Sequence, residues 1–321
     1  MTEMENYQTV YENRASYILY NIFRKIGKGR VIMPANICPI VPATIIKAGL
    51  KPHFIDIDSK EFTMDKDILL ETIRNDSSDF SGLIWVRTYG NEQPDLNPLI
   101  RSVKESSASI FFVDDQCLSA PSFKAEKSES DLILCSTGYS KIAELGWGGY
   151  GFLTSDFDYE KFPIDYKESA HEDLQNIFRE AIAKERKIEV PDTPWLDGRR
   201  PELSFEEYKN EVLRLSQKAL AHKAKINAIY AEILPAEIQM GACFQHWRFN
   251  ILVKNKEQII RQLFKAGLFA SSHYAAVAPL YSNQNAPIAK ELSRRIINLF
   301  NDGRFDEEMA EKTALIIKEN L

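Results

Sequence analysis

CSTGYSKIAELGWGG, at residues 135–149, is the stretch that decides the fold of this chain. It places Lys141 in a loop of small residues, and apolar runs at 131–134 and 150–153 flank that loop. This pattern predicts a lysine held between two short strands. A buried lysine amine is partly deprotonated and can attack a carbonyl to form a Schiff base. A lone lysine on a turn is more often an ordinary surface residue. The rest of the chain decides whether Lys141 is a reactive lysine or a surface lysine.

Upstream of the loop, short apolar runs alternate with helical patterns. The predicted strands lie at 31–33, 53–55, 82–86 and 110–113, and the predicted helices at 9–26, 39–48, 65–74 and 96–105. Strands that alternate with helices of about ten residues indicate a mostly parallel sheet with helices on both faces. We therefore expect an α/β fold.

The pattern changes after about residue 156, where the chain becomes charged and mainly helical. It then continues with a long helix, two strands and two further helices, predicted at 204–232, 247–253, 256–266, 296–300 and 306–320. This mixture predicts a smaller α+β domain at the C-terminal end. We expect a large domain at 1–200 and a small domain at 201–321.

Composition excludes several classes of function. With 44% hydrophobic residues the chain can bury a full core, and no apolar run approaches the ~20 residues of a membrane span. A net charge of -6 without a basic block argues against a nucleic-acid partner. The acidic start at 1–6 does not have the layout of a signal peptide. The cysteines form no Cys-x-x-Cys pair for a metal, so we expect no metal site and buried free thiols in a reducing cytoplasm: Cys38, Cys117, Cys135 and Cys243.

Polar residues recur where the predicted strands end. They are Asn36, the run 87–90 with Tyr89, Asp114 with Asp115, and Ser136. Each has a simpler explanation, since an Asp can cap a segment, a Ser can form a turn and a Tyr can pack in a core. Ligands of parallel sheets bind beyond the carboxyl ends of the strands, which is where these residues would meet Lys141. A lysine, a strand-end Asp and a Ser together suggest pyridoxal 5′-phosphate, whose ring acts as an electron sink and whose phosphate suits a helix N-terminus.

With these motifs the sequence resembles the DegT-type sugar aminotransferases, a family of fold-type I pyridoxal-phosphate enzymes. The spacing Ser136-x4-Lys141-x4-Gly146-x-Gly148-Gly149 matches the lysine motif of the family. The segments 31–58, 89–96 and 112–115 are similar to further family motifs, and a weaker similarity returns at 247–320. The resemblance implies the fold-type I transferase architecture, in which a mostly parallel sheet carries the cofactor and a smaller α+β domain follows.

The resemblance also implies roles for individual residues. Lys141 and Asp115 would be the catalytic residues, Lys141 through its imine to the cofactor and Asp115 through the pyridine nitrogen, with Asp114 as the alternative to Asp115. Further cofactor contacts are assigned to Ser136, Arg14, Ala15, Cys38 and Gln116. The substrate would meet Tyr89 and Asn36.

The chain departs from the family at several of these positions. Leu118 stands where Gln or His is usual near the ring oxygen, Cys38 where an aromatic side chain often stacks on the ring, and Trp147 where a Glu is usual between the glycines. The Asn-Tyr-Arg segment by which a neighbouring subunit reaches the cofactor is not recognisable. These departures leave the substrate class open.

The sequence therefore favours a pyridoxal-phosphate aminotransferase that converts a nucleotide-linked keto sugar, with glutamate as amino donor, in a process such as polysaccharide biosynthesis. Two alternatives remain: a related enzyme that acts on an amino acid or keto acid, and a non-catalytic relative of the same fold. The family builds its sites between subunits, so we expect a cytoplasmic homodimer. The helical stretch 167–187 is the candidate for the segment that reaches the partner, with Asn176 for a cofactor contact.

Overall fold

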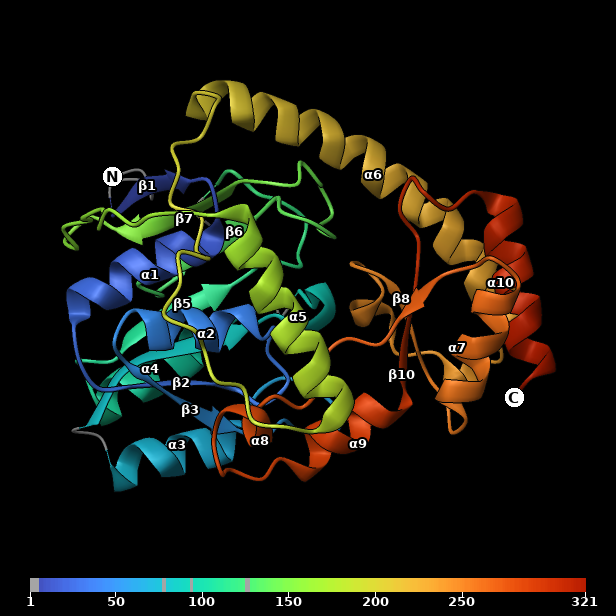
Figure 1. Ribbon diagram of the computed structural model, residues 1–321, viewed down its shortest axis with the longest axis horizontal. Helices are drawn as coiled ribbons and strands as arrows, with labels where there is room; N and C mark the ends of the chain where they lie inside the picture. The colour runs from blue at the N-terminus through green and yellow to red at the C-terminus, as the bar shows by residue number, and fades with distance from the viewer. Residues whose placement is uncertain (1–5, 77–78, 93–94, 125–127) are drawn as a thin grey trace.

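The computed structural model describes residues 6–76, 79–92, 95–124 and 128–321, so most of the acidic start at 1–6 lies outside the described residues. The larger sheet has seven strands in the order β1-β7-β6-β5-β4-β2-β3 (Figure 1). The strands are β1 (Tyr7–Glu12), β2 (Arg30–Pro34), β3 (Lys51–Ile55), β4 (Phe80–Val86), β5 (Phe111–Asp115), β6 (Leu132–Ser136) and β7 (Gly149–Thr154). From β6 to β3 neighbouring strands run parallel, and β7 and β1 are antiparallel to their neighbours. The predicted mostly parallel α/β sheet is confirmed.

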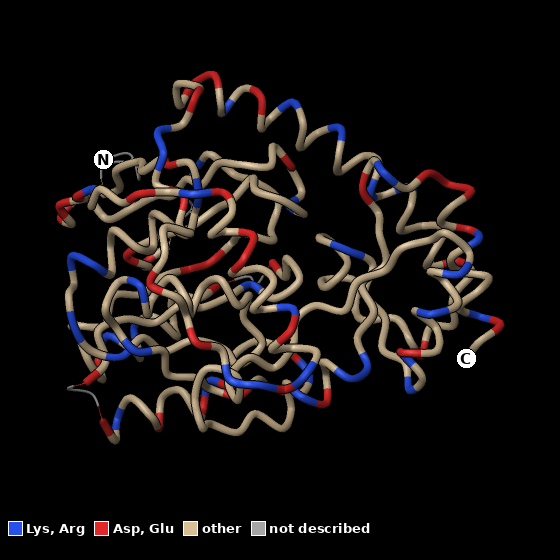
Figure 2. Tube along the Cα trace, viewed as in Figure 1, with Lys and Arg blue, Asp and Glu red and all other residues tan. Residues whose placement is uncertain are grey.

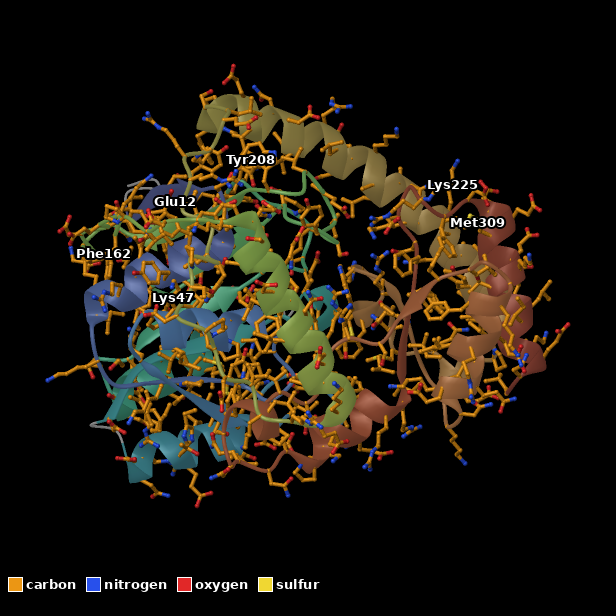
Figure 3. All side chains as sticks on the ribbon, viewed as in Figure 1. Glu12, Lys47, Phe162, Tyr208, Lys225 and Met309 are labelled. Carbon is orange, nitrogen blue, oxygen red and sulfur yellow. The ribbon has the colours of Figure 1, made fainter. Side chains whose placement is uncertain are left out.

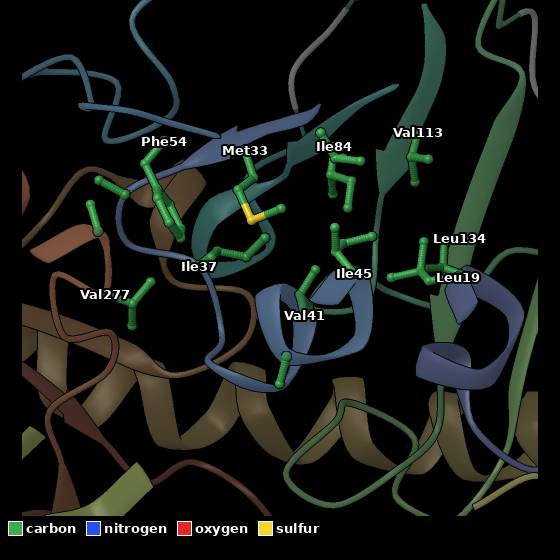
Figure 4. Close-up of a cluster of buried hydrophobic side chains, with 14 of the residues drawn as sticks. Leu19, Met33, Ile37, Val41, Ile45, Phe54, Ile84, Val113, Leu134 and Val277 are labelled. Carbon is green, nitrogen blue, oxygen red and sulfur yellow. The ribbon is translucent and has the colours of Figure 1, made fainter. Parts of the chain in front are cut away.

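Helices cover both faces of this sheet because the strands carry apolar residues on both sides. One core contains Met33, Ile84 and Val113 beneath helices α1 (Ala15–Ile26) and α2 (Ile40–Lys47). Figure 4 shows Val41 and Ile45 of α2 facing these strand residues, with Leu19 of α1 beside Leu134. The alternate strand residues, such as Ile32, Leu83 and Phe112, form the opposite core with α3 (Lys66–Asn75) and α4 (Asn97–Ser106).

The helix predicted at 9–26 is wrong in its first part. Residues 7–12 form β1, which pairs in antiparallel register with β7 along its whole length, from Tyr7 opposite Thr154 to Glu12 opposite Gly149. Apolar side chains in this stretch fit a helical spacing as well as a strand. The hydrogen bonds to a strand some 140 residues away decide between the two, and no local pattern carries that information.

Helix α6 (Phe205–Ile233) joins the two ends of the molecule (Figure 1). It begins with a capping box, in which Ser204 and Glu207 satisfy each other's backbone N–H groups. Near its start, Tyr208 packs against β6 and β7 (Figure 3), and near its end Ile226 and Tyr230 enter a separate core. At 1.5 Å per residue its 29 residues extend about 43 Å.

The separate core belongs to a three-stranded antiparallel sheet in the order β8-β10-β9. Its elements are β8 (Phe249–Leu252), α7 (Lys256–Lys265), β9 (Ala270–Ser271), β10 (Ile296–Leu299) and α10 (Glu307–Glu319). Two short helices between β9 and β10, α8 (Ala278–Tyr281) and α9 (Pro287–Arg295), instead return to the large core, where Val277 lies near Phe54 (Figure 4). The division at residue 200 stays a prediction.

Acidic and basic residues are interspersed along the chain, for example along α6 (Figure 2). Among the described residues, none of the helices combines the length and the apolar character needed to cross a membrane. The cysteines are free thiols, and the prediction that all are buried is wrong: Cys135 is buried, Cys38 and Cys117 are partly exposed, and Cys243 is exposed on a short turn.

Strand β7 and the first turn of α1 approach each other closely at Gly149. A Cβ atom placed on Gly149 would lie 2.1 Å from the backbone nitrogen of Ala15 and 2.4 Å from its Cα. Both neighbours are backbone atoms of a helix start, so they cannot move aside as a flexible side chain can. Glycine at 149 is therefore what permits α1 to begin against the strand that leaves the lysine loop.

Gly149→Ala should consequently lower the free energy of unfolding by about 1–3 kcal/mol, because the added methyl group overpacks a backbone contact. Denaturant unfolding followed by circular dichroism measures this. Gly303→Ala is the matched control, since nothing lies within 4 Å of its added Cβ. Equal stability of the two variants would contradict the close approach.

Candidate functional site

A cavity of about 460 Å³ opens at the carboxyl ends of the parallel strands. Its walls include Asn36 after β2, Thr88 after β4, Asp115 at the end of β5 and Ser136 at the end of β6. Lys141, from the loop that follows β6, completes this side. The structure therefore brings together the strand-end residues that the sequence pointed to, at the edge where parallel sheets bind ligands.

The first turn of α1 forms one end of the cavity. Arg14 is the N-cap residue and has extended backbone angles, and Ala15 and Ser16 line the cavity. The cap has no side-chain hydrogen bond, and the first turn carries no acidic residue. Backbone N–H groups at such a helix start favour an anion. Ser136 lies at the same end, where its Oγ accepts a hydrogen bond of 3.2 Å from the N–H of Gly138.

Arg14 ties this helix start to the lysine loop. Its Nη1 donates to the carbonyl oxygen of Gly146 at 2.6 Å, and its Nε lies 3.6 Å from the buried carboxylate of Asp197. Asp197 also accepts from Asn13 Nδ2 at 2.7 Å. Burial alone would raise the pKa of Asp197, but the hydrogen bonds of Arg199 and the charge of Arg14 outweigh it and lower the pKa. The end of the cavity at α1 is thus a rigid, positively charged frame.

The two neighbouring aspartates at the end of β5 point to opposite faces of the sheet. Asp114 is fully buried and forms a bidentate ion pair with Arg87, whose Nε and Nη2 donate to it at 2.9 and 2.7 Å. Asp115 lines the cavity instead and accepts one hydrogen bond of 2.9 Å from the N–H of Cys117. Burial raises the pKa of Asp115, and the positive charge of Lys141 works against that rise. The geometry favours Asp115 over Asp114 as the carboxylate that meets a ligand.

Two residues assigned from the sequence do not line the cavity. Gln116 points to the opposite face, where its Nε2 donates to Asp114 at 2.7 Å. Tyr89 is fully buried, and its hydroxyl donates to the carbonyl oxygen of His273 at 2.9 Å. Gln116 lies outside the cavity because side chains alternate across a strand, so it shares the side of Asp114 and not that of Asp115. Tyr89 follows β4 with a left-handed backbone, φ 57°, and its side chain lies outside the cavity as well.

Lys141 is half-buried in the cavity wall. Asp115, Cys38 and Cys117 line the same cavity, and the positive charge of Lys141 acts to lower the pKa of each of them. Burial raises the pKa of both thiols, so Cys38 and Cys117 are neutral neighbours of the amine. Within the part of the chain that the structure describes, no hydrogen bond or ion pair engages the Lys141 amine. An unpaired amine inside a cavity is available to react.

The opposite wall of the cavity was missed by sequence reasoning. His171, Gln175 and Phe178 lie along one face of helix α5 (Glu168–Lys184), and Trp195 and Leu196 follow in the next segment. The spacing i, i+4, i+7 was the available signal, but it cannot say which surface a helix covers. Helix α5, which the sequence suggested as the segment that reaches a partner subunit, lines the cavity of its own chain. Asn176, the suggested cofactor contact, is exposed, and its Oδ1 accepts a hydrogen bond from Arg179.

Three residues that line this cavity carry a buried polar atom with no hydrogen-bond partner among the described residues: the Thr88 hydroxyl, the indole nitrogen of Trp195 and Nε of Arg14. An unsatisfied buried polar group costs about 1–3 kcal/mol, and a ligand that hydrogen-bonds to it removes this cost. Together with the helix start at one end and the unpaired amine in the middle, these groups fit an anionic, hydrogen-bonding ligand that carries a carbonyl.

The different positions of the two aspartates predict different effects of their Asn variants. Asp114→Asn should lower the free energy of unfolding by about 3–5 kcal/mol, because it removes one charge of a buried ion pair. Asp115→Asn should leave stability at pH 7 unchanged or raised. The raised folded-state pKa means that its carboxylate opposes folding above the unfolded-state pKa, and the amide removes that cost.

Urea unfolding of both variants at pH 7 and pH 4 measures this difference. At pH 4, close to the ordinary pKa of an aspartate, the effect of Asp115→Asn should shrink, because the carboxyl group is no longer fully ionised in the unfolded chain. A large loss of stability in Asp115→Asn would contradict the assignment.

Comparison with known proteins gives one family. Residues 14–127 match the model of the DegT/DnrJ/EryC1/StrS aminotransferase family. This region contains α1, the strands β2 to β5, and Asp115. No curated protein sequence matches the chain.

Solved structures resemble the whole chain. A DegT DnrJ EryC1 StrS aminotransferase from Brucella abortus has a TM-score of 0.68 at 17% identity, covering 99% of this chain and 87% of that one. The sugar aminotransferase CalS13 from Micromonospora echinospora has a TM-score of 0.66 at 18% identity, covering 98% and 87%. The E. coli GDP-4-keto-6-deoxy-D-mannose-3-dehydratase with bound hydrated PLP has a TM-score of 0.64 at 15% identity, covering 98% and 88%.

At these identities the structural likeness concerns the fold, and it extends over nearly the full length of the chain. The family match supplies what the fold alone does not, because it is a match of sequence. The resemblance stated from the sequence is supported by this match: residues 14–127 match the model of the DegT/DnrJ/EryC1/StrS aminotransferase family, and the fold of a solved structure described as such an aminotransferase extends over 99% of the chain.

Proposed function

We propose that this chain is a pyridoxal-phosphate-dependent aminotransferase. The observation that carries the proposal is the cavity in which the unpaired amine of Lys141, the carboxylate of Asp115 and the first turn of α1 converge. Arg14, Ala15 and Ser136 would hold the phosphate at the start of α1. Asp115 would face the pyridine nitrogen, and Cys38 would lie beside the ring in place of an aromatic residue.

When bound, pyridoxal phosphate supplies an aldehyde and an electron-poor ring that stabilises negative charge at a substrate carbon. The chain contributes the groups around that carbon. Lys141 Nζ is placed to take up and return a proton, because no other side chain engages it. Asp115, whose carboxylate is destabilised by burial, gains most from a protonated ring nitrogen. Helix α5 and Trp195 keep water away from the reacting atoms.

For the substrate we propose a nucleotide-linked keto sugar, with glutamate as amino donor. The support is the chemistry of the wall opposite the sheet. His171, Gln175 and Trp195 offer imidazole, amide and indole groups, which can form hydrogen bonds with the hydroxyl groups of a sugar. CalS13 is a sugar aminotransferase with the same fold, which agrees with this choice.

A different pyridoxal-phosphate reaction is the second candidate. The E. coli relative is a dehydratase on the same fold, and this chain has Leu118 in the cavity wall and Trp147 in the lysine loop where the family usually carries polar residues. Such an enzyme could act on an amino acid or keto acid. A non-catalytic relative would keep the cavity but show no turnover.

Lys141→Ala should abolish both the cofactor linkage and transamination, and the unfolding midpoint should stay nearly unchanged because the half-buried side chain makes no hydrogen bond or ion pair among the described residues. When pyridoxal phosphate is linked to a lysine, the wild-type protein should be yellow. Borohydride reduction of this protein followed by peptide mass mapping locates the linkage. A pyridoxyl label on another lysine, or none, would refute the proposal.

The substrate proposal is tested by a screen of nucleotide keto sugars against keto acids, with glutamate as donor. We expect amino-sugar formation with release of 2-oxoglutarate and at least a tenfold preference over keto acids in kcat/KM. Turnover of keto acids alone would favour the second candidate, and a yellow protein that turns over neither would favour the non-catalytic relative.

We also propose that the chain works as a cytoplasmic homodimer. Free cysteines fit a reducing compartment. Tyr139, at the rim of the cavity, is 71% exposed although it is a large aromatic side chain, and a second copy would cover it. Light scattering at micromolar concentration should therefore give twice the mass of 36.8 kDa. An active monomer would overturn this arrangement.

A further inference from the structure

The residue directly before Lys141 is held from both sides of its backbone. Ser140 has φ 58°, a left-handed conformation that is unfavourable for a residue other than glycine. Its N–H donates to Glu144 Oε2 at 3.0 Å, and its carbonyl oxygen accepts from the indole Nε1 of Trp247 at 2.6 Å. These two bonds fix the direction in which the chain enters Lys141.

Trp247 is itself held firmly. It is 3% exposed, and its ring stacks on Tyr89 at 6.4 Å and on Tyr274 at 6.1 Å, with interplanar angles of 15° and 14°. The buried amine of Lys223, in α6, donates to its carbonyl oxygen at 2.8 Å and to Asn301 Oδ1 at 2.7 Å. Trp247 lies two residues before β8, while its side chain packs in the large core beside Tyr89, so it links the small sheet to the large core.

The hydrogen bond between the Ser140 N–H and Glu144 is also supported by the part of the chain that forms the small sheet. Arg304 lies in the turn after β10 and donates through Nη2 to Glu144 Oε2 at 2.9 Å. The same guanidinium donates to Asp302, which also pairs with the buried Arg248. Glu144 is therefore oriented between Arg304 and the N–H of Ser140. Both partners of Ser140 are thus connected to the part of the chain that forms the small sheet, Trp247 through its backbone and Glu144 through Arg304.

We propose that Trp247 and Arg304 are positioning residues for Lys141: the small sheet fixes the Ser140 backbone and thereby the direction of the reactive amine. Trp247 is the stronger of the two, because its bond is buried, whereas Arg304 is exposed and its ion pair is screened by solvent. The inference rests on the proposed function for its catalytic consequence. Its structural part, the control of the 137–148 loop, holds independently of the reaction.

Trp247→Phe is the test, because it keeps an aromatic ring in the stack and removes the indole N–H. The buried ring area that is lost with it is matched in the control variant described below. We expect faster hydrogen exchange in 137–148, borohydride-trapped labelling of Lys141 slowed several-fold, and kcat reduced about tenfold with KM within about twofold. The pH profile of the visible absorbance should also shift, because the amine no longer sits in one orientation. Arg304→Gln should change hydrogen exchange, labelling and kcat in the same direction as Trp247→Phe, but by a smaller amount.

Trp85→Phe is the matched control. Trp85 is fully buried on the opposite face of the sheet, and its indole N–H has no partner among the described residues. It should leave exchange in 137–148, labelling and kcat as in the wild type. The proposal is overturned if Trp247→Phe behaves like Trp85→Phe while both are folded. If the wild type takes no label at Lys141, the proposed function fails instead, and the exchange comparison still decides whether Trp247 holds the loop.

Discussion

The contact between strand β7 and the first turn of α1 is the constraint on which the site depends. It places residue 149 against residue 15, so the chain that leaves the lysine loop lies beside the helix start that would receive an anion. The N–H of Gly148 donates to the carbonyl oxygen of Asn13 at 2.7 Å, and Arg14 donates to Gly146. Residues 13–15 and residues 146–149 are thereby held together. This contact places the amine of Lys141, the carboxylate of Asp115 and the start of α1 around one cavity.

Hydrogen bonding and burial give different environments to two neighbouring residues of the same type, Asp114 and Asp115. Asp114 and Asp115 are neighbours, yet Asp114 is paired with Arg87 and Gln116, whereas Asp115 is hydrogen-bonded by Cys117, has no cationic hydrogen-bond partner among the described residues and faces the cavity. An acid that is buried but poorly paired is ready for a cationic ligand, whereas a bidentate ion pair is not. The strand's alternation, rather than any difference in residue type, produces this distinction.

Much of this could be read from the sequence. The alternation of strands and helices predicted the parallel sheet, and Lys141, Asp115, Ser136, Arg14, Ala15, Cys38 and Asn36 all line the cavity. Gln116 and Tyr89 do not, because their orientation depends on strand phase and on one left-handed residue. Strand β1 and the wall formed by α5 were missed for another reason. Each is defined by a partner far away in the sequence, and local periodicity contains no information about such partners.

The path of the backbone between the two hydrophobic cores has a mechanical consequence. The chain reaches the small core within α6, returns to the large core at 240–247 and re-enters the small one at Phe249. It returns again between Ala270 and Ala276, and crosses once more between Ile296 and Ile297. A two-domain protein joined by one linker can swing open widely. Several covalent crossings, one of them a continuous helix, restrict relative motion to small sliding displacements. Substrate entry in such a molecule depends on local movement of the cavity wall rather than on separation of its halves.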